Sequence, residues 1–131
     1  MMYTISKEFH FSASHQLTHL AHEQPDHPCA RLHGHNYVVR VILKGYLTDA
    51  NGFIVDYNEL NWFKTIIDTF YDHQHLNDVC GGDLETTAEH LAKRFYNIVE
   101  TWMKERPDSE DIWVEAVEVQ ETPKTCARYG S

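Results

Sequence analysis

Two segments of this chain alternate apolar and polar residues with the period of a β-strand, and both carry histidines in the apolar phase. The first, residues 3–15, places its apolar side chains at odd positions and closes on His15. The second, residues 32–41, opens on His33-Gly34-His35 and continues in the same phase. Successive side chains of a strand point to opposite faces, so each histidine continues the apolar face of its own strand. The alternation therefore predicts two strands that aim three imidazoles at one surface.

Three imidazole nitrogens on one surface match the ligand set of a catalytic zinc site, which keeps a fourth position open. A lone histidine is more often a surface or satisfied core residue. Here the i, i+2 pair His33 and His35, together with His15 in the same phase, favours metal binding. No fourth strong donor has an obvious placement, so an open catalytic site is favoured over a closed structural one. We predict these three residues as metal ligands and Zn2+ as the cofactor.

Length and charge bound the class of protein. At 131 residues the chain is expected to form a single domain, residues 1–131, that buries roughly two-thirds of its unfolded surface. A net charge of −9 argues against nucleic-acid or membrane-surface partners, because both carry negative charge. No span of about 18 apolar residues predicts a membrane helix. Three widely separated cysteines and the lack of a signal-peptide pattern indicate a soluble, cytoplasmic protein.

The remaining pattern predicts a small α+β fold. We expect strands at about 3–14 and 35–47, an Asn51-Gly52 turn with a short return strand at 53–55, and closing strands at 112–120 and 125–129. Helical periodicity predicts one helix from the capping residue Asp56 to about residue 70. A second helix is expected from Thr86 or Thr87, where Thr86-x-x-Glu89 matches a capping box, to Arg106-Pro107.

This order, β-β-α-α-β-β, predicts a four-stranded antiparallel sheet with two helices on one face. The segment between the helices, residues 72–77, is expected to be a loop. One sheet face and the sheet edges would then lack cover, so we expect a homo-oligomer.

Side chains at four further positions could take part in catalysis or ligand binding. Cys29 precedes His33 by four residues and could be a metal ligand, an inert buried thiol, or a thiolate nucleophile or base. Asp72-His73 could be an acid–base pair, although a histidine at a helix C-terminus is the stronger alternative. Glu121 could anchor a substrate amine or be a solvated turn residue. Glu89 has a structural alternative in the capping box.

Taken together, these residues resemble the 6-pyruvoyl-tetrahydropterin synthase / 6-carboxytetrahydropterin synthase family. The matching elements span nearly the whole chain in family order, and their joint specificity is high. They are His15, Cys29-Ala30-Arg31-Leu32-His33-Gly34-His35-Asn36-Tyr37, Asp72-His73-x-x-Leu76-Asn77, Thr87-Ala88-Glu89 and Glu121.

The resemblance implies the family's T-fold and zinc held by His15, His33 and His35. It implies that Cys29, Asp72 and His73 are the catalytic proton-transfer residues. It further implies that Glu121 binds the guanidine-like edge of a pterin, with Thr87 and Glu89 lining the same pocket. Trimers whose sheets join into a barrel, stacked as hexamers with active sites at subunit interfaces, are also implied.

The spacing within the cysteine motif favours one branch of the family. Three residues separate Cys29 from His33, as in bacterial 6-carboxytetrahydropterin synthases of the queuosine pathway. The resemblance thus implies a lyase that converts 7,8-dihydroneopterin triphosphate to 6-carboxy-5,6,7,8-tetrahydropterin, releasing acetaldehyde and triphosphate. Ala88 departs from the family pattern, in which a hydroxyl-bearing or other small residue is common at this position. The alternatives are a 6-pyruvoyl-tetrahydropterin synthase, which eliminates triphosphate without that cleavage, and a non-catalytic metal-binding protein.

Overall fold

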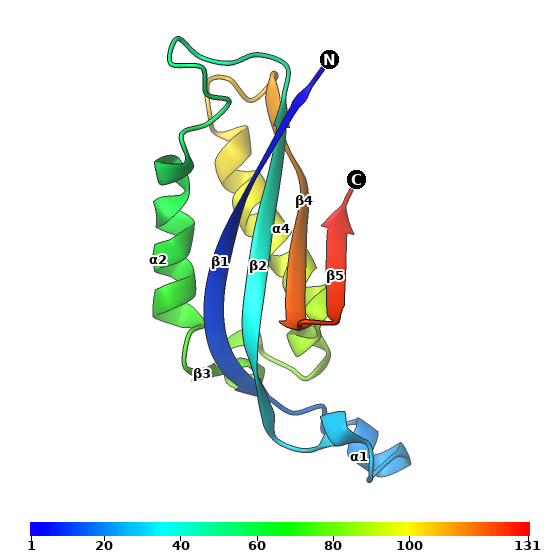
Figure 1. Ribbon diagram of the computed structural model, residues 1–131. Helices are drawn as coiled ribbons and strands as arrows, with labels where there is room; N and C mark the ends of the chain where they lie inside the picture. The colour runs from blue at the N-terminus through cyan, green and yellow to red at the C-terminus, as the bar shows by residue number, and fades with distance from the viewer.

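A computed structural model describes residues 1–131 as one mixed five-stranded sheet with its two long helices on one face (Figure 1). The sheet order is β3-β1-β2-β4-β5. The four longer strands pair antiparallel, whereas β3 pairs parallel to β1. The strands are β1 (Tyr3–His15), β2 (His33–Gly45), β3 (Gln74–His75), β4 (Ile112–Thr122) and β5 (Thr125–Gly130).

The α+β class is confirmed, but the expectation of a four-stranded, purely antiparallel sheet is wrong. The additional strand, β3, consists of two residues in the segment 72–77 that the sequence pattern assigned to a loop. It pairs with Ala13 and Ser14 of β1 where the chain returns from the end of the first long helix. A strand of two residues has no periodicity of its own, so only the tertiary fold determines it.

Two helices supply the layer that covers the sheet, α2 (Asn61–Phe70) and α4 (Ala88–Lys104). They cover the apolar odd-numbered side chains of β1 and β2, such as Phe9 and Val39, which are buried in one core. Phe11 stacks on Tyr37 with 4.7 Å between ring centroids, and Phe63 of α2 packs edge-on against Phe9. The short helices are α1 (Leu20–Glu23) and α3 (Leu76–Cys80), with 3-10 helices at Pro28–Ala30, Tyr57–Leu60 and Leu84–Thr86.

The capping residues were predicted with mixed success. Asp56 does form a capping box with Glu59, although the box opens the 3-10 helix that precedes α2. The capping box expected at Thr86 is wrong, because Thr87 is the N-cap of α4 and its hydroxyl accepts the His90 N–H at 3.3 Å. Thr86 instead lies fully buried one residue earlier.

The short return strand expected at residues 53–55 is absent. The turn itself is present, with Gly52 at φ 87° and the Asp49 carboxylate accepting the Asn51 and Phe53 N–H groups. Ile54 and Val55 that follow are buried in the core without pairing to a strand. Their apolar character therefore reflects packing between β2 and α2, which the sequence pattern does not distinguish from a buried strand.

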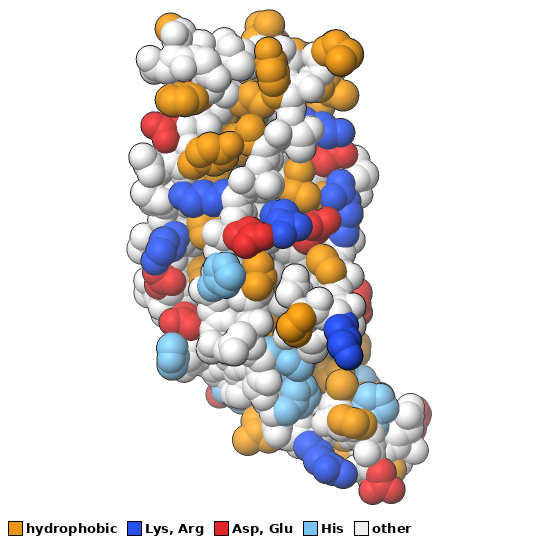
Figure 2. Space-filling model, viewed as in Figure 1, with side chains coloured by type: hydrophobic (Ala, Val, Ile, Leu, Met, Phe, Trp, Pro, Cys, Tyr) orange, Lys and Arg blue, Asp and Glu red, His pale blue; other side chains and the backbone are white.

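The other face of the sheet has no helical cover and carries charged side chains across its middle (Figure 2). The segment between β1 and β2, with α1, extends at the end of the sheet where the histidines of both strands lie (Figure 1). No helix in the structure combines the length and hydropathy needed to cross a membrane.

Candidate metal centre and active site

His15, His33 and His35 converge at the end of the β1–β2 pair. His15 lies directly opposite His33 in the register, and His35 lies opposite Ala13. One ring nitrogen from each histidine falls within 4.8 Å of the other two. The ring centroids are 4.4 Å apart for His15–His33, 5.2 Å for His15–His35 and 4.9 Å for His33–His35. The three side chains could therefore hold one metal ion.

Backbone carbonyls fix the orientation of two of these rings. Nδ1 of His15 donates to the Thr86 carbonyl at 3.1 Å, and Nδ1 of His33 donates to the Arg31 carbonyl at 2.7 Å. A carbonyl oxygen only accepts, so both rings carry their proton on Nδ1 and keep Nε2 as a free lone pair. Metal-binding histidines are held in this way by outer partners that fix the tautomer.

The free nitrogens lie in a dry environment. His15 is 2% exposed, and Nε2 of both His15 and His35 is buried without a hydrogen-bond partner. Burial, followed by the neighbouring histidines, lowers the pKa of His15 to about 4 and also lowers the pKa of His35. His15 is thus neutral near pH 7, and the lowered pKa of His35 favours its neutral form as well. The neutral ring is the state that binds a metal. Two orphaned imidazole nitrogens and a third within reach fit a three-nitrogen zinc site.

Glu121 brings a carboxylate to the edge of this cluster. Its Oε2 lies 3.5 Å from Nε2 of His35, near the end of β4. Burial raises the pKa of Glu121, the Ala88 N–H at the start of α4 opposes that rise, and the Glu89 charge adds to it. Few protein groups donate hydrogen bonds to this half-buried carboxylate, so it can accept hydrogen bonds from a ligand rich in N–H groups.

Thr87 and Glu89 lie at the first turn of α4, beside Ala88. The Thr87 hydroxyl is engaged in capping and also donates to the Leu84 carbonyl at 3.2 Å. Glu89 is exposed and makes no ion pair, and its charge is felt by Glu121. Both predicted substrate-binding residues are therefore on the same helix terminus as the N–H that faces Glu121.

Cys29 lies in the 3-10 helix that precedes β2. The thiol is free and half-buried, and its sulfur is not part of the group of ligand atoms formed by the three histidines. The Cys29 N–H donates to Nδ1 of His27 at 3.1 Å, and its carbonyl accepts the Leu17 N–H at 2.8 Å. These backbone contacts fasten the thiol-bearing turn to the segment that follows β1.

Asp72 and His73 form a pair at the outer edge of β1. Nδ1 of His73 lies 2.9 Å from the Asp72 carboxylate, whose other oxygen accepts the Ser12 N–H at 2.9 Å. These contacts, the Ser12 N–H first, lower the pKa of Asp72. The His73 side chain is 82% exposed, its backbone has φ 59°, and it makes no hydrogen bond or ion pair with the three histidines.

Two residues near the cluster were not identified from sequence. The Thr86 carbonyl accepts a hydrogen bond from Nδ1 of His15, and the Thr86 hydroxyl lies 3.2 Å from the same nitrogen. His75 bonds to the Ser14 hydroxyl at 3.0 Å, and its charge lowers the pKa of His15. The sequence signal at Thr86 was a capping pattern, and His75 had no periodic signal because β3 has two residues.

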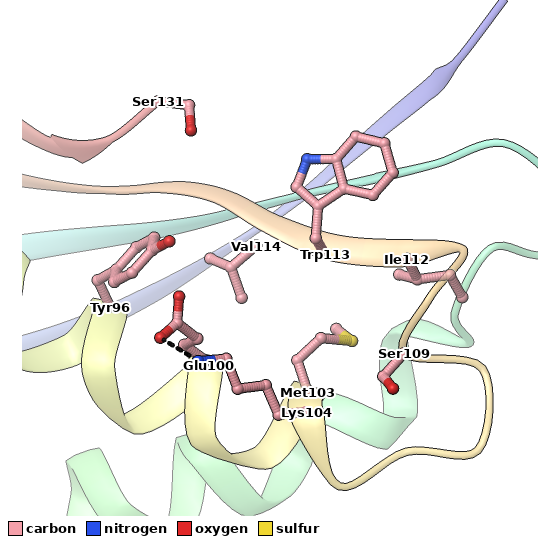
Figure 3. A pocket seen from close by; sticks show the side chains of 9 residues that line it. All are labelled: Tyr96, Glu100, Met103, Lys104, Ser109, Ile112, Trp113, Val114 and Ser131. Atoms are coloured by element: carbon pink, nitrogen blue, oxygen red, sulfur yellow. Dashed lines mark ion pairs between the residues drawn. The ribbon is translucent and has the colours of Figure 1, made fainter.

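A separate hollow lies between α4 and the first residues of β4, with a volume of about 220 Å3 (Figure 3). Glu100 and Lys104 form an ion pair of 3.2 Å at its rim, and none of the histidines takes part in its lining. It offers no cluster of metal-binding or nucleophilic side chains, so the histidine cluster remains the candidate site.

Comparisons with known proteins identify the family of the chain. A family profile described as 6-pyruvoyl tetrahydropterin synthase matches residues 4–131. A 6-carboxy-5,6,7,8-tetrahydropterin synthase of Synechocystis is 32% identical, with 99% of this chain and 95% of the relative covered. The enzyme of that name from Bacillus subtilis is 29% identical, with 97% of this chain and 84% of the relative covered.

The fold has a close counterpart among solved structures. The 6-pyruvoyl tetrahydropterin synthase of Caenorhabditis elegans superposes with a TM-score of 0.79 at 22% identity, covering 100% of this chain and 96% of that one. This likeness supports the fold implied by the resemblance, apart from the strand count corrected above. The profile match covers nearly every residue, and the chain belongs to the 6-pyruvoyl tetrahydropterin synthase family.

Proposed function

We propose that this protein is a zinc-dependent lyase that converts 7,8-dihydroneopterin triphosphate to 6-carboxy-5,6,7,8-tetrahydropterin, with release of acetaldehyde and triphosphate. The proposal places it in the cytoplasm as a homo-oligomer that supplies queuosine biosynthesis. The Synechocystis and Bacillus subtilis relatives carry the name of this activity. The observation that carries it is the three-histidine cluster with the Glu121 carboxylate 3.5 Å from His35.

His15, His33 and His35 would hold the zinc through one ring nitrogen each. When bound there, the ion would supply a Lewis acid for the two hydroxyl groups of the substrate side chain. The low pKa of His15 and His35 keeps these ligands deprotonated at neutral pH. The Thr86 and Arg31 carbonyls keep two of the rings oriented before any ligand arrives.

Glu121 would bind the pterin ring. Its carboxylate accepts hydrogen bonds from the amino group and ring N–H of the pyrimidine edge, which is a charge-assisted, two-point contact. The proximity of Glu121 to His35 lets one bound molecule reach both the carboxylate and the metal ligands. Thr87 and Glu89, at the same end of α4, would line the rim of this pocket.

Cys29 and the Asp72–His73 pair would move protons. In this proposal the Cys29 thiolate removes a proton from the side-chain carbon next to the ring, and the His73 imidazolium returns a proton to the ring. Asp72 orients His73 through the 2.9 Å contact. Since His73 is exposed and makes no contact with the cluster of its own chain, we assign it to the site of an adjacent copy.

The test is incubation of the zinc-loaded protein with 7,8-dihydroneopterin triphosphate, followed by detection of acetaldehyde and the carboxylated pterin. Acetaldehyde release, lost in Cys29→Ala and in His33→Ala, is the expected result. Turnover that is unchanged in both variants would overturn the site assignment.

The second candidate is the 6-pyruvoyl-tetrahydropterin synthase reaction, since the family profile and the nematode structure carry that name. It predicts triphosphate release with a pyruvoyl product and no acetaldehyde. A non-catalytic metal-binding role, using the ten histidines, predicts several metal ions per chain and no turnover. Product analysis combined with the metal content therefore separates the three.

A further inference from the structure

The segment between β1 and β2, which carries Cys29, reaches beyond the end of the sheet (Figure 1). Its short helix α1 has no buried residue, and Ala30 is the only buried residue among residues 16–31. Apolar packing therefore does little to fix the place of the thiol. Ordering a segment costs conformational entropy that contacts have to offset, so polar contacts are the source of order here.

Gln16, the residue after His15, holds the turn that contains Cys29. Its Nε2 donates to the Ala30 carbonyl at 2.9 Å, and the N–H of the next residue, Leu17, donates to the Cys29 carbonyl at 2.8 Å. Two consecutive residues thus bind two consecutive carbonyls of the turn. Because this pair directly follows a residue of the histidine cluster, it sets the distance between the thiol-bearing turn and that cluster.

Asn77, at the start of α3, fixes the backbone of Gln16. Its Oδ1 accepts the Gln16 N–H at 3.0 Å, and its Nδ2 donates to the Gln16 carbonyl at 2.7 Å. A side-chain amide that binds both backbone groups of one residue takes the place of a peptide group on a neighbouring strand. Asn77 therefore continues the pairing of β3 with β1 at a point where the chain has already entered α3.

Asp83 joins this contact to the next part of the segment. Its Oδ1 accepts from Nδ2 of Asn77 at 2.7 Å, and its Oδ2 accepts from the Thr18 N–H at 2.7 Å and from the Thr18 hydroxyl. Its backbone carbonyl accepts from the Thr86 hydroxyl at 2.7 Å, and the Thr86 carbonyl orients His15. One residue therefore contacts both the support of a histidine of the cluster and the segment that carries the thiol.

We propose that Gln16, supported by Asn77 and Asp83, is a positioning residue that holds the Cys29 thiol in place for proton transfer. The inference rests on the proposed function, in which that thiol moves a proton. Gln16 acts through the turn alone, since the one hydrogen bond of its side chain goes to the Ala30 carbonyl. A displacement of a reacting group by about 1 Å can lower turnover by about 100-fold, so such a contact affects the rate without touching the substrate.

The test is Gln16→Met, which removes the donor and keeps the length of the side chain. The Cys29 thiol is half-buried, so release of its turn should accelerate its alkylation by iodoacetamide several-fold. Acetaldehyde release should fall by about 10- to 100-fold, with KM near the wild-type value because the histidines and Glu121 keep their places. Faster alkylation together with slower turnover identifies a thiol that is misplaced rather than less reactive.

Alkylation is measured on zinc-loaded protein that carries Cys126→Ser, and mass spectrometry identifies the modified residue. Buried Cys80 is the internal control for folding, because its alkylation would show that the whole chain has opened. Gln24→Met makes the same change at an exposed position of the same segment, where the side chain makes no hydrogen bond. This variant should leave the alkylation rate and the turnover unchanged.

Gln16→Arg is the conservative replacement, because Nε of arginine is as many bonds from the backbone as Nε2 of glutamine and also donates. It should restore slow alkylation and most of the turnover.

Asn77→Asp tests the support of Gln16. It keeps the shape of the side chain but sets a carboxylate against the Gln16 carbonyl and the Asp83 carboxylate, so it should reproduce the pattern of Gln16→Met. Asn97→Asp makes the same change on the exposed side of α4, where the side chain makes no hydrogen bond, and should leave alkylation and turnover unchanged.

The positioning role is overturned if Gln16→Met leaves alkylation of Cys29 at the wild-type rate or if Gln16→Arg fails to restore that rate. Alkylation of Cys80 along with Cys29 would also overturn it, because the substitution would then act on the whole fold.

Turnover separates this inference from the proposed function. Rapid alkylation of Cys29 in Gln16→Met with wild-type acetaldehyde release would overturn the positioning role and leave the lyase. The expected alkylation pattern in a protein that releases no acetaldehyde, even as wild type, would support the hold on the turn and overturn the lyase.

Discussion

Nδ1 of His15 lies 3.1 Å from the carbonyl oxygen of Thr86, and this contact leaves Nε2 buried without a partner. The fully buried Thr86 therefore decides which nitrogen of His15 faces His33 and His35. One nitrogen of this histidine is fixed by a carbonyl, and the other is buried and unpaired. The ring is therefore oriented for metal binding before a metal is bound. Its effects on metal binding and stability can be measured without substrate, and its effects on turnover can be measured with substrate.

Loss of one histidine of the cluster should remove the metal. We expect His33→Ala to lower the zinc content from about one ion per chain to near zero, since two imidazoles do not complete the three-ligand set. Elemental analysis after dialysis checks this. His22→Ala is the control, because that residue is exposed on α1 and its side chain makes no hydrogen bond or ion pair. Equal loss of zinc in both variants would contradict the assignment of the cluster.

Thr86 should matter through its hydroxyl as well as its carbonyl. Thr86→Val removes the bond from the hydroxyl to the Asp83 carbonyl, 2.7 Å long, while keeping the backbone that holds His15. Loss of a buried hydrogen bond should reduce the free energy of unfolding by about 1 kcal/mol. Denaturant titration checks this value.

A matched control for that substitution is Thr101→Val. Its hydroxyl donates to the Asn97 carbonyl at 2.9 Å on the exposed side of α4, where water can replace the bond. We expect a change of less than about 0.5 kcal/mol there. Zinc competition should also show weaker binding for Thr86→Val, by up to about 10-fold, and unchanged binding for the control.

The metal-free protein should lose stability as the pH falls below neutral. The pKa of His15 is about 4 in the folded state and near 6.5 when the chain is unfolded. The unfolded state therefore binds the proton first, and stability present above pH 6.5 is lost as the pH falls toward 4. Between pH 7.5 and 4.5 we expect this residue to account for a loss of about 2 kcal/mol.

His15→Asn isolates this contribution. Glu121, whose pKa is raised, acts in the opposite direction, because its folded carboxyl takes up a proton earlier on acidification. The difference in unfolding free energy between wild type and His15→Asn cancels the shared groups. A difference that does not change with pH would contradict a neutral, buried His15.

The sequence predicted the long elements because their signals are repeated. Alternation over residues 3–15 and the helical stripe that ends near Phe70 each involve many side chains, and a packed sheet with its helices satisfies both. β3 and the segment 53–55 have two or three informative residues each. Their structure depends on which long element they contact. The local sequence therefore did not predict β3, and it predicted a strand at 53–55 that the structure does not contain.

The residues of the candidate site also fall into two groups, those that a periodic pattern predicts and those that only the tertiary fold brings together. The strand phase of His15, His33 and His35 is a periodic signal, and the structure brings these three together. The contact of Glu121 with His35 joins residues 86 positions apart, and only the β2–β4 pairing creates it. Thr86 was visible only as a capping residue, since a carbonyl that holds a distant imidazole leaves no pattern in the local sequence.

Cys29 should be needed for turnover and dispensable for the metal. Its sulfur is outside the group of ligand atoms, so Cys29→Ala should retain about one zinc ion per chain while acetaldehyde release falls by about 100-fold or more. Cys126→Ser, which alters a thiol exposed on β5, is the control and should keep turnover near the wild-type value. Zinc loss in Cys29→Ala would instead identify the thiol as a metal ligand.

Mixing two inactive variants should restore activity if each site draws on two copies. His73 is 82% exposed at the β1 edge and makes no contact with the cluster of its own chain, whereas Cys29 precedes the strand that carries His33 and His35. Oligomers reassembled from equal amounts of Cys29→Ala and His73→Ala chains would contain some sites with both wild-type groups. Random assortment gives about a quarter of the wild-type turnover for a site shared by two chains.

Chains of Cys29→Ala mixed with Cys29→Ala/His73→Ala are the control and should stay inactive, because no chain supplies the thiol. Absence of recovery in the first mixture, with subunit exchange verified by mass, would place His73 and Cys29 in one chain's site or remove His73 from the reaction.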